Sequence, residues 1–236
     1  MIKMEEKMRN QQEYKLLQAI ATNFQETEDF RYLMMKYNCA IKEVRTKLEV
    51  LNEDFRVRYK RNPIERISSR IKTPGSIVEK LKRNHWDISA ESVFENLHDV
   101  AGVRVICSFV DDIYSIAEVL LKQDDIRLIR EKDYIKNPKE NGYRSLHLIV
   151  EVPIFLTDRT EYMQVEVQIR TIAMDFWASL EHKVRYKKNI PYINDIEERL
   201  KRCAEESAKL DLEMQNINHE IDEITKDMET FTLSKD

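Results

Sequence analysis

The spacing of apolar residues changes twice along this chain, and this change restricts most strongly what the chain can fold into. Over residues 29–60, apolar side chains recur every three or four positions, as they do on one face of a long helix. The middle of the chain instead contains short runs rich in Val, Ile and Tyr, which favour strands. Helical spacing returns after residue 170. The expected fold is therefore of the α+β class, a sheet flanked by long N- and C-terminal helices.

The short runs predict the strands, and the segments between them predict shorter helices. Strands are expected at residues 67–72, 100–109, 126–134, 145–152 and 162–170. Helices are expected at residues 74–81, 113–122 and 171–188. Pro74 suits the first turn of its helix, where no backbone hydrogen bond is lost. These elements predict a mixed sheet of about five strands with helices packed on it.

The last helix has the most regular pattern in the chain, a heptad seam in which spacings of four and three alternate. Its members are Ile196, Leu200, Cys203, Ser207, Leu210, Met214, Ile217, Ile221, Ile224, Met228 and Phe231. A helix of this length buries one seam only against a partner, either the N-terminal helix or another subunit. Cys203 and Ser207 weaken the seam midway.

Three regions follow from these patterns. We expect an N-terminal helical region at residues 1–61, a mixed-sheet domain at 62–190 and the heptad helix at 191–236, which offers an assembly surface.

Charge and cysteine usage exclude several classes of protein. The 236 residues carry a formal net charge of −4, which argues against coating DNA, since that requires a dominant basic surface. The three cysteines have no CxxC spacing, and no apolar run approaches the length of a membrane span. We expect a cytoplasmic protein that binds neither DNA nor a membrane.

Two carboxylates are candidates for a metal site. Glu166 and Gln168 lie two apart on a predicted strand and therefore project to one face. Asp99 precedes a segment in which Gly102 allows close approach of the backbone to a ligand. Carboxylates of this kind bind magnesium. A turn-capping Asp99 and a solvated Glu166 explain the same spacing equally well.

A convergence of basic groups makes the functional interpretation stronger. Seven basic residues fall around the same predicted edge of the sheet: Arg70, Lys72, Lys80, Arg104, Lys132, Lys139 and Arg144. Ser76 and Lys80 lie one turn apart at a helix start, which suits a phosphate group. Tyr143 follows Gly142 in a turn, where its ring either stacks on a base or folds onto the sheet. His98-Asp99 also occurs in metal-dependent phosphohydrolases, but the other histidines are scattered, so we interpret this pair as coincidence.

Several ordered motifs resemble the synthetase domain of RelA/SpoT-like alarmone enzymes. The motifs are Asp133-Tyr134-Ile135, Pro138-Lys139, Asn141-Gly142-Tyr143-Arg144-Ser145-Leu146-His147 and Val165-Glu166-Val167-Gln168-Ile169-Arg170-Thr171, with segments 70–81 and 99–104 upstream. The resemblance extends over residues 62–187, and the chain is most similar to small synthetases of the RelP type. Region 62–190 is thereby identified as an alarmone synthetase domain.

The resemblance implies a nucleotidyltransferase-like fold and a magnesium-dependent pyrophosphokinase. Such enzymes move the β,γ-pyrophosphate of ATP to the ribose 3′-hydroxyl of GDP or GTP, making ppGpp or pppGpp and AMP. Asp99 and Glu166 match the positions that hold Mg²⁺, and Glu166 also matches the base that helps to deprotonate the hydroxyl. Long family members carry hydrolase and regulatory domains that do not fit here, so no hydrolase activity is expected.

The remaining matches divide between the two nucleotides. Arg70 and Arg104 match a pair that sandwiches adenine, and Lys72, Ser76 and Lys80 match contacts to the ATP phosphates. Tyr143 matches the ring that stacks on guanine. Other expected contacts to the acceptor nucleotide are Asn141, His147 and Gln168, with Lys132, Lys139 and Arg144 as ligands for its phosphates. Small synthetases are commonly homotetramers, so the resemblance implies this assembly. It also suggests an alarmone effector or single-stranded RNA as a further partner.

Two other functions fit part of the pattern. A binding module would hold nucleotide or single-stranded RNA without turnover, and a polymerase-type nucleotidyltransferase would release pyrophosphate. The leaving product, AMP or pyrophosphate, separates these functions from the synthetase.

Overall fold

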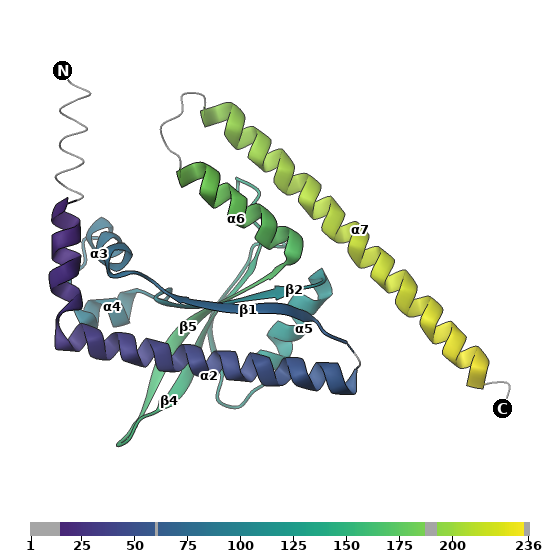
Figure 1. Cartoon of the computed structure of the whole chain (residues 1–236), viewed down its shortest axis with the longest axis horizontal. Coiled ribbons are helices and arrows are strands. Elements are labelled where there is room, and N and C mark those ends of the chain that lie inside the picture. The colour runs from purple at the N-terminus through teal and green to yellow at the C-terminus, as the bar shows by residue number, and fades with distance from the viewer. Residues whose placement is uncertain (1–14, 60, 187–192, 234–236) are drawn as a thin grey trace.

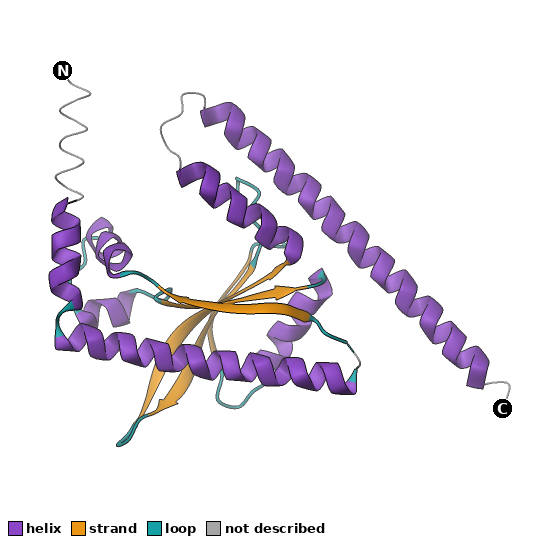
Figure 2. Cartoon of the chain, in the orientation of Figure 1, coloured by secondary structure: helices purple, strands orange, loops and turns teal. Residues whose placement is uncertain are grey.

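A five-stranded mixed sheet forms the centre of the computed structural model, which describes residues 15–59, 61–186 and 193–233 (Figure 1). The strands, orange in Figure 2, lie in the order β1-β2-β5-β4-β3. Strands β2 and β5 run parallel, and the other neighbouring pairs run antiparallel. The strands are β1 (Ile64–Ile71), β2 (Ala101–Cys107), β3 (Arg127–Asp133), β4 (Leu146–Phe155) and β5 (Thr160–Thr171). The expected α+β fold with a mixed five-stranded sheet is confirmed.

One face of the sheet is apolar and covered by helices. Every second residue of β5, such as Val165 and Val167, is buried, because successive side chains of a strand point to opposite faces. Helix α2 (Glu28–Arg58), which is capped by the Thr27 hydroxyl, and helix α5 (Val110–Leu121) pack on this face. The N-terminal helical region thus contributes to the same core as the sheet.

The other face of the sheet carries the polar members of the same alternation, including Arg104, Glu166 and Gln168. Helix α3 (Pro74–Arg83) follows β1, and helix α4 (Ala90–Asn96) leads toward β2. Helix α6 (Ile172–Tyr186) follows β5 directly and bears on the end of the sheet. This polar face is therefore bordered by helices without being covered along its length.

The element boundaries differ from the predicted ones by up to three residues, at the start of β1, the end of β4 and the start of α5. Strand β1 begins three residues before the predicted start at residue 67, because most of its side chains are exposed and produce little apolar alternation. The seven-residue helix α4 was not expected, and its signal is a Ser89 N-cap. The predicted ends of two helices, at residues 60 and 188, lie outside the described residues.

Helix α7 (Ile193–Leu233) packs beside α6 and α5, at a distance from α2 (Figure 1). It docks through a face that contains the buried Ala204 and Gln215, and the Trp177 indole donates a hydrogen bond to the Leu200 carbonyl at 2.8 Å. The described seam residues from Leu210 to Ile224 are exposed. The seam is therefore not buried against the N-terminal helix, and the side chains of Met228 and Phe231 lie outside the described residues.

No helix in the described part of the chain is both long enough and apolar enough to cross a membrane.

Candidate active site

A cleft of about 470 Å³ opens on the polar face of the sheet. Six of the residues that line it were predicted from the sequence: Lys80, Asp99, Lys132, Lys139, His147 and Glu166. They come from α3, the segment before β2, strands β3, β4 and β5, and the loop between β3 and β4. Pairing of β4 with β5 sets His147 opposite Gln168, two residue pairs from Glu166. The fold thus gathers residues that are up to 86 positions apart in the sequence, from Lys80 to Glu166.

Five side chains on this face form a closed cycle of hydrogen bonds, which we call the polar ring: Tyr143, His147, Glu166, Gln168 and Arg170. The Tyr143 hydroxyl lies 2.8 Å from His147 Nε2, and His147 Nδ1 lies 3.0 Å from Glu166 Oε1. Gln168 Nε2 donates to Glu166 Oε2 at 2.7 Å. Arg170 Nη2 closes the cycle by donating to Gln168 Oε1 at 3.2 Å and to the Tyr143 hydroxyl. When the His147 imidazole carries its proton on Nδ1, each hydrogen bond of this cycle has one donor and one acceptor.

The polar ring fixes the charge of Glu166. Burial favours the neutral acid, but the hydrogen bonds from His147 and Gln168 outweigh burial and hold the pKa of Glu166 below its usual value. The Asp99 carboxylate acts to raise the pKa of Glu166, because two carboxylates facing one cleft repel each other. Glu166 is therefore an ionised acceptor at neutral pH.

Asp99 is held by the two lysines that were predicted to bind the ATP phosphates. Lys80 Nζ donates to Asp99 Oδ1 at 2.8 Å, and Lys72 Nζ donates to Asp99 Oδ2. Burial raises the pKa of Asp99, but these hydrogen bonds outweigh it and bring the pKa below its ordinary value. The predicted metal ligand and the predicted phosphate ligands thus neutralise one another in this arrangement.

A second cavity of about 190 Å³ is lined by Gln168, two residues beyond Glu166 on β5. Arg70 and Arg104, the predicted adenine pair, line this cavity from β1 and β2. Gln168 lies between the cavity and Glu166 along β5. Gly102 pairs with Arg70, and a Cβ at Gly102 would lie 3.8 Å from the Arg70 side chain, which is ordinary contact. The structure therefore supplies two neighbouring cavities that share the polar strand β5.

Tyr143 lies in the loop between β3 and β4, which we call the acceptor loop (residues 134–145). Its ring makes edge contacts with Tyr134 and His147, at centroid distances of 5.9 and 5.8 Å. The Lys139 ammonium lies over the rings of both tyrosines, 4.7 Å from the Tyr134 centroid and 4.8 Å from the Tyr143 centroid. Asn141 shapes the loop, accepting from the Tyr143 amide at 3.2 Å and donating to Glu181 at 3.2 Å.

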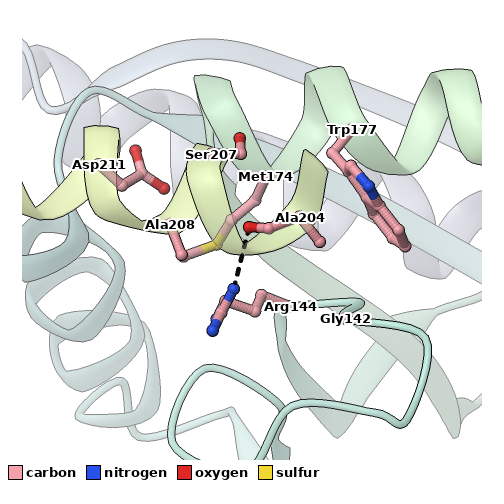
Figure 3. Close-up of a pocket in the computed structure, with 8 residues that line it drawn as sticks. All are labelled: Gly142, Arg144, Met174, Trp177, Ala204, Ser207, Ala208 and Asp211. Carbon is pink, nitrogen blue, oxygen red and sulfur yellow. Dashed lines mark hydrogen bonds between the residues drawn. The ribbon is translucent and has the colours of Figure 1, made fainter. Parts of the chain in front are cut away.

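Helix α7 supports the acceptor loop from behind (Figure 3). Gly142 has φ +87°, and a Cβ at this position would lie 2.5 Å from the Cβ of Ala204. Arg144 reaches α7, where Nη1 donates to the Ala204 carbonyl at 3.2 Å. The cavity left between the loop and the helix is only about 10 Å³, so the contact is closely packed. Arg144 is thereby directed to α7 and away from the cleft, contrary to its predicted contact with acceptor phosphates.

Ser76 is likewise not gathered into the cleft. Its hydroxyl accepts from Thr73 Oγ1 at 2.9 Å in the exposed first turn of α3. Sequence reasoning in turn missed several cleft residues, namely Arg83, Asn84, Trp86, Asn96, His98, Arg130, Tyr134 and Ile149. Arg130 had a recognisable signal, since it lies two residues before Lys132 on β3 and shares its face. Trp86 and Asn96 lie in segments without a clear period.

The carboxylates of the cleft fit a magnesium ion. Mg²⁺ prefers oxygen ligands and commonly combines one or two carboxylates with substrate phosphates and water. Asp99 and Glu166 provide carboxylate oxygens in one cleft. Among the described residues there is no group of three or more His, Cys, Asp or Glu that could hold a metal without further ligands. The donor set thus suits an ion that arrives with a polyphosphate.

Two buried polar atoms beside the cavities have no hydrogen-bond partner within the described part of the chain, His98 Nδ1 and Arg104 Nε. Buried polar atoms are nearly always paired, and exceptions concentrate where another group binds. One of these atoms belongs to each cavity.

Comparison with known proteins agrees with this geometry. Residues 69–191 match the family described as "Region found in RelA / SpoT proteins". GTP pyrophosphokinase YwaC of Bacillus subtilis (strain 168) is 46% identical over 83% of this chain and 93% of its own length.

Solved structures share this fold over most of the chain. The small alarmone synthetase 1 from Bacillus subtilis bound to its product pppGpp has a TM-score of 0.75 at 35% identity, covering 83% of this chain and 99% of that one. The same synthetase bound to AMPCPP has a TM-score of 0.69 at 34% identity, covering 84% of this chain and 100% of that one.

Proposed function

Because this chain belongs to the RelA/SpoT family, as a small alarmone synthetase with GTP pyrophosphokinase activity, we propose that it transfers the β,γ-pyrophosphate of ATP to the ribose 3′-hydroxyl of GDP or GTP. The 3′-oxygen forms a bond to the β-phosphorus of ATP. The bond between that phosphorus and the α,β-bridging oxygen breaks, and AMP leaves with this oxygen. The products are ppGpp or pppGpp and AMP. Related synthetases solved with pppGpp and with AMPCPP support both nucleotide classes as ligands.

The acceptor occupies the larger cleft in this proposal. Guanine stacks on Tyr143, whose orientation the polar ring fixes, while His147 and Gln168 face the ribose and base. Lys132 and Lys139 line the cleft and bind the acceptor phosphates. Asn141 contributes mainly through the loop, since its amide is engaged with Glu181 and the Tyr143 amide.

ATP occupies the side of the smaller cavity, with adenine between Arg70 and Arg104. Its phosphates reach the start of α3, where the Ser76 hydroxyl lies at the positive end of the helix dipole. Lys72 and Lys80 exchange their hydrogen bonds to Asp99 for the phosphates. This exchange costs little electrostatically, because each ammonium leaves one anion for another.

Release of the lysines frees Asp99 to join Glu166 as a magnesium ligand. Asp99 and Glu166 would hold Mg²⁺, and its charge would offset the repulsion between two polyanions. Glu166 orients the 3′-hydroxyl and receives its proton late, since a carboxylate with a lowered pKa is a weak base. Pyrophosphoryl transfer tolerates a weak base, because its transition state is loose and depends mostly on positioning.

The observation that supports this proposal most strongly is the polar ring. It joins Tyr143, on the acceptor loop, to Glu166, on β5, through the Tyr143–His147 and His147–Glu166 hydrogen bonds of 2.8 and 3.0 Å, and by a second path through Arg170 and Gln168. The ring would thus hold a base platform and a carboxylate in a fixed relation, as a transfer between two nucleotides requires.

The decisive test identifies the products. Purified protein with ATP, Mg²⁺ and GDP should yield ppGpp and AMP by ion-exchange chromatography, whereas release of pyrophosphate would contradict the proposal. Glu166→Gln should lower kcat by at least about 10²-fold, as expected for a group that stabilises developing charge. Glu161→Gln is the matched control on the same strand, where the carboxylate pairs with Lys36 at 2.8 Å away from the cleft.

Two further expectations belong to this function. Incubation of the protein with pppGpp should release no pyrophosphate, because we propose synthesis without hydrolysis.

The exposed seam of α7 supports assembly into a homotetramer, since five large apolar side chains are each at least 42% exposed: Leu210, Met214, Ile217, Ile221 and Ile224.

A further inference from the structure

Asp175 has no part in the reaction as proposed above, yet it gathers three arginines. It lies in the first turn of α6 and is 7% exposed. Its Oδ2 accepts from Arg66 Nη2 at 2.9 Å. Its Oδ1 accepts from Arg104 Nη1 at 3.3 Å and from Arg170 Nη1 at 3.2 Å. A carboxylate in a first helical turn usually complements the helix dipole at the surface, which leaves this burial and this number of partners unexplained.

The sheet register brings the three arginines to one place. Arg66 on β1 and Arg170 on β5 both pair with Ile106 on β2, from opposite sides. Arg104 lies two residues before Ile106 and therefore projects to the same face. Helix α6 starts at the end of β5 and lays Asp175 across this face.

The carboxylate makes this crowding of cations tolerable. Burial and repulsion from Arg170 lower the pKa of Arg104, and Asp175 opposes that shift. Arg170 is itself only 4% exposed, so water screens it little. Without the negative charge of Asp175, Arg104 and Arg170 would repel each other and at least one of them would move.

Each of the two arginines supports a different nucleotide platform. Arg104 lines the smaller cavity opposite Arg70, where adenine is proposed to bind. Arg170 donates to the Tyr143 hydroxyl, and its guanidinium carbon lies 5.0 Å from the centre of the Tyr143 ring. Displacement of Arg104 alters the donor side, and displacement of Arg170 alters the acceptor side.

We propose that Asp175 is a positioning residue that holds the adenine platform and the guanine platform in register, through Arg104 and Arg170. This inference rests on the proposed function, because it concerns the same two substrate sites. It predicts that one substitution, remote from either base, weakens the binding of both nucleotides. A carboxylate that only stabilised the start of α6 would alter stability and leave both Michaelis constants unchanged.

The test compares KM for ATP and for GDP in variants that remain folded. Asp175→Asn keeps the shape and removes the charge, and it should raise both KM values by about tenfold, as expected for the loss of charged hydrogen bonds. Arg104→Ala should raise the KM for ATP alone, and Tyr143→Ala the KM for GDP alone. Asp112→Asn is the matched control, because Asp112 is also buried and paired with an arginine, Arg61, but lies in α5.

Direct binding gives a readout that does not depend on turnover. Titration calorimetry with AMPCPP and with GDP, each alone, should show weaker binding of both to Asp175→Asn than to Asp112→Asn. Should Asp175→Asn fail to fold, Arg170→Lys retains the charge but loses the forked contact to Asp175 and Tyr143, and it should raise the KM for GDP by about tenfold.

The outcomes separate this inference from the proposed function. If the wild-type protein makes ppGpp and folded Asp175→Asn keeps both KM values within twofold, the positioning role is wrong while the synthetase stands. An effect on one nucleotide only would also overturn it. If the wild-type protein makes no ppGpp, the proposed function fails, and calorimetry still decides whether Asp175 governs both binding sites.

Discussion

Single residues at the base of the acceptor loop have roles that are more structural than chemical. Asp133 ends β3, and its carboxylate accepts from the Ile135 amide at 2.9 Å, the Lys136 amide at 3.0 Å and the Tyr114 hydroxyl at 3.1 Å. Burial raises the pKa of Asp133, but these donors together outweigh it and lower the pKa below its ordinary value. The ionised carboxylate therefore fixes the turn that begins the acceptor loop.

Asp133→Asn should lower the free energy of unfolding by about 1–2 kcal/mol at pH 7, because the hydrogen bonds to a charged acceptor weaken. A carboxyl whose pKa is lowered by folding stabilises the protein above its unfolded pKa, about 3.9, and loses this contribution as the pH falls through the folded pKa. The difference between wild type and variant, measured by urea unfolding, should thus shrink below about pH 4. Asp158→Asn, at a 65% exposed side chain, is the control. A difference that stays constant down to pH 2 would contradict the assignment.

At the scale of elements, the contact between α7 and the acceptor loop decides the loop conformation. Gly142→Ala introduces a Cβ at φ +87° and within 2.5 Å of the Ala204 Cβ. Strain of about 1–3 kcal/mol at such a position should raise the KM for GDP by roughly tenfold and leave the KM for ATP less affected. Gly75→Ala is the matched control, because a Cβ there meets its nearest atom at an ordinary 3.5 Å.

A second variant separates the two causes of that strain. Ala204→Gly removes the opposing Cβ and should recover part of the activity of Gly142→Ala, while the unfavourable φ remains. If the double variant binds GDP no better than Gly142→Ala alone, the helix does not control the loop through this contact.

Local patterns predicted the elements well where one face is apolar. They did not predict side-chain positions that depend on packing between elements distant in the sequence. The alternation of β5 placed Glu166 and Gln168 on one face, and two more residues of the same alternation would have added Arg170. The start of β1 was predicted three residues too late, because an edge strand with exposed side chains lacks that pattern. Asp175 and the direction of Arg144 depend on how α6 and α7 approach the sheet, which no local spacing encodes.

At the scale of the whole molecule, α7 presents two different faces. One face docks through Ala204 and Gln215, while the seam borders an apolar groove of about 850 Å³ between α6 and α7, lined in part by Phe176, Leu210 and Met214. Exposed apolar surface of this extent on a single helix is typical of an association site.

Leu210→Asp should therefore shift the protein from an assembly to smaller species, since a charge within an apolar interface is costly. Light scattering coupled to size-exclusion chromatography measures this directly. Leu212→Asp provides a close control: both leucines are 60% exposed on α7, but only Leu210 belongs to the seam and lines the groove. Equal masses for wild type and Leu210→Asp would exclude the seam as the assembly surface.

The position of Lys139 has a consequence for which molecules the protein accepts. Its ammonium lies over the rings of Tyr134 and Tyr143, on the surface that an incoming base would use. Guanosine would have to displace this cation while offering it no negative charge in return, whereas a 5′-diphosphate offers one as the base arrives. If guanine stacks on Tyr143 as proposed, the loop would select for base and phosphate together, and free nucleosides would compete poorly with the phosphorylated acceptor.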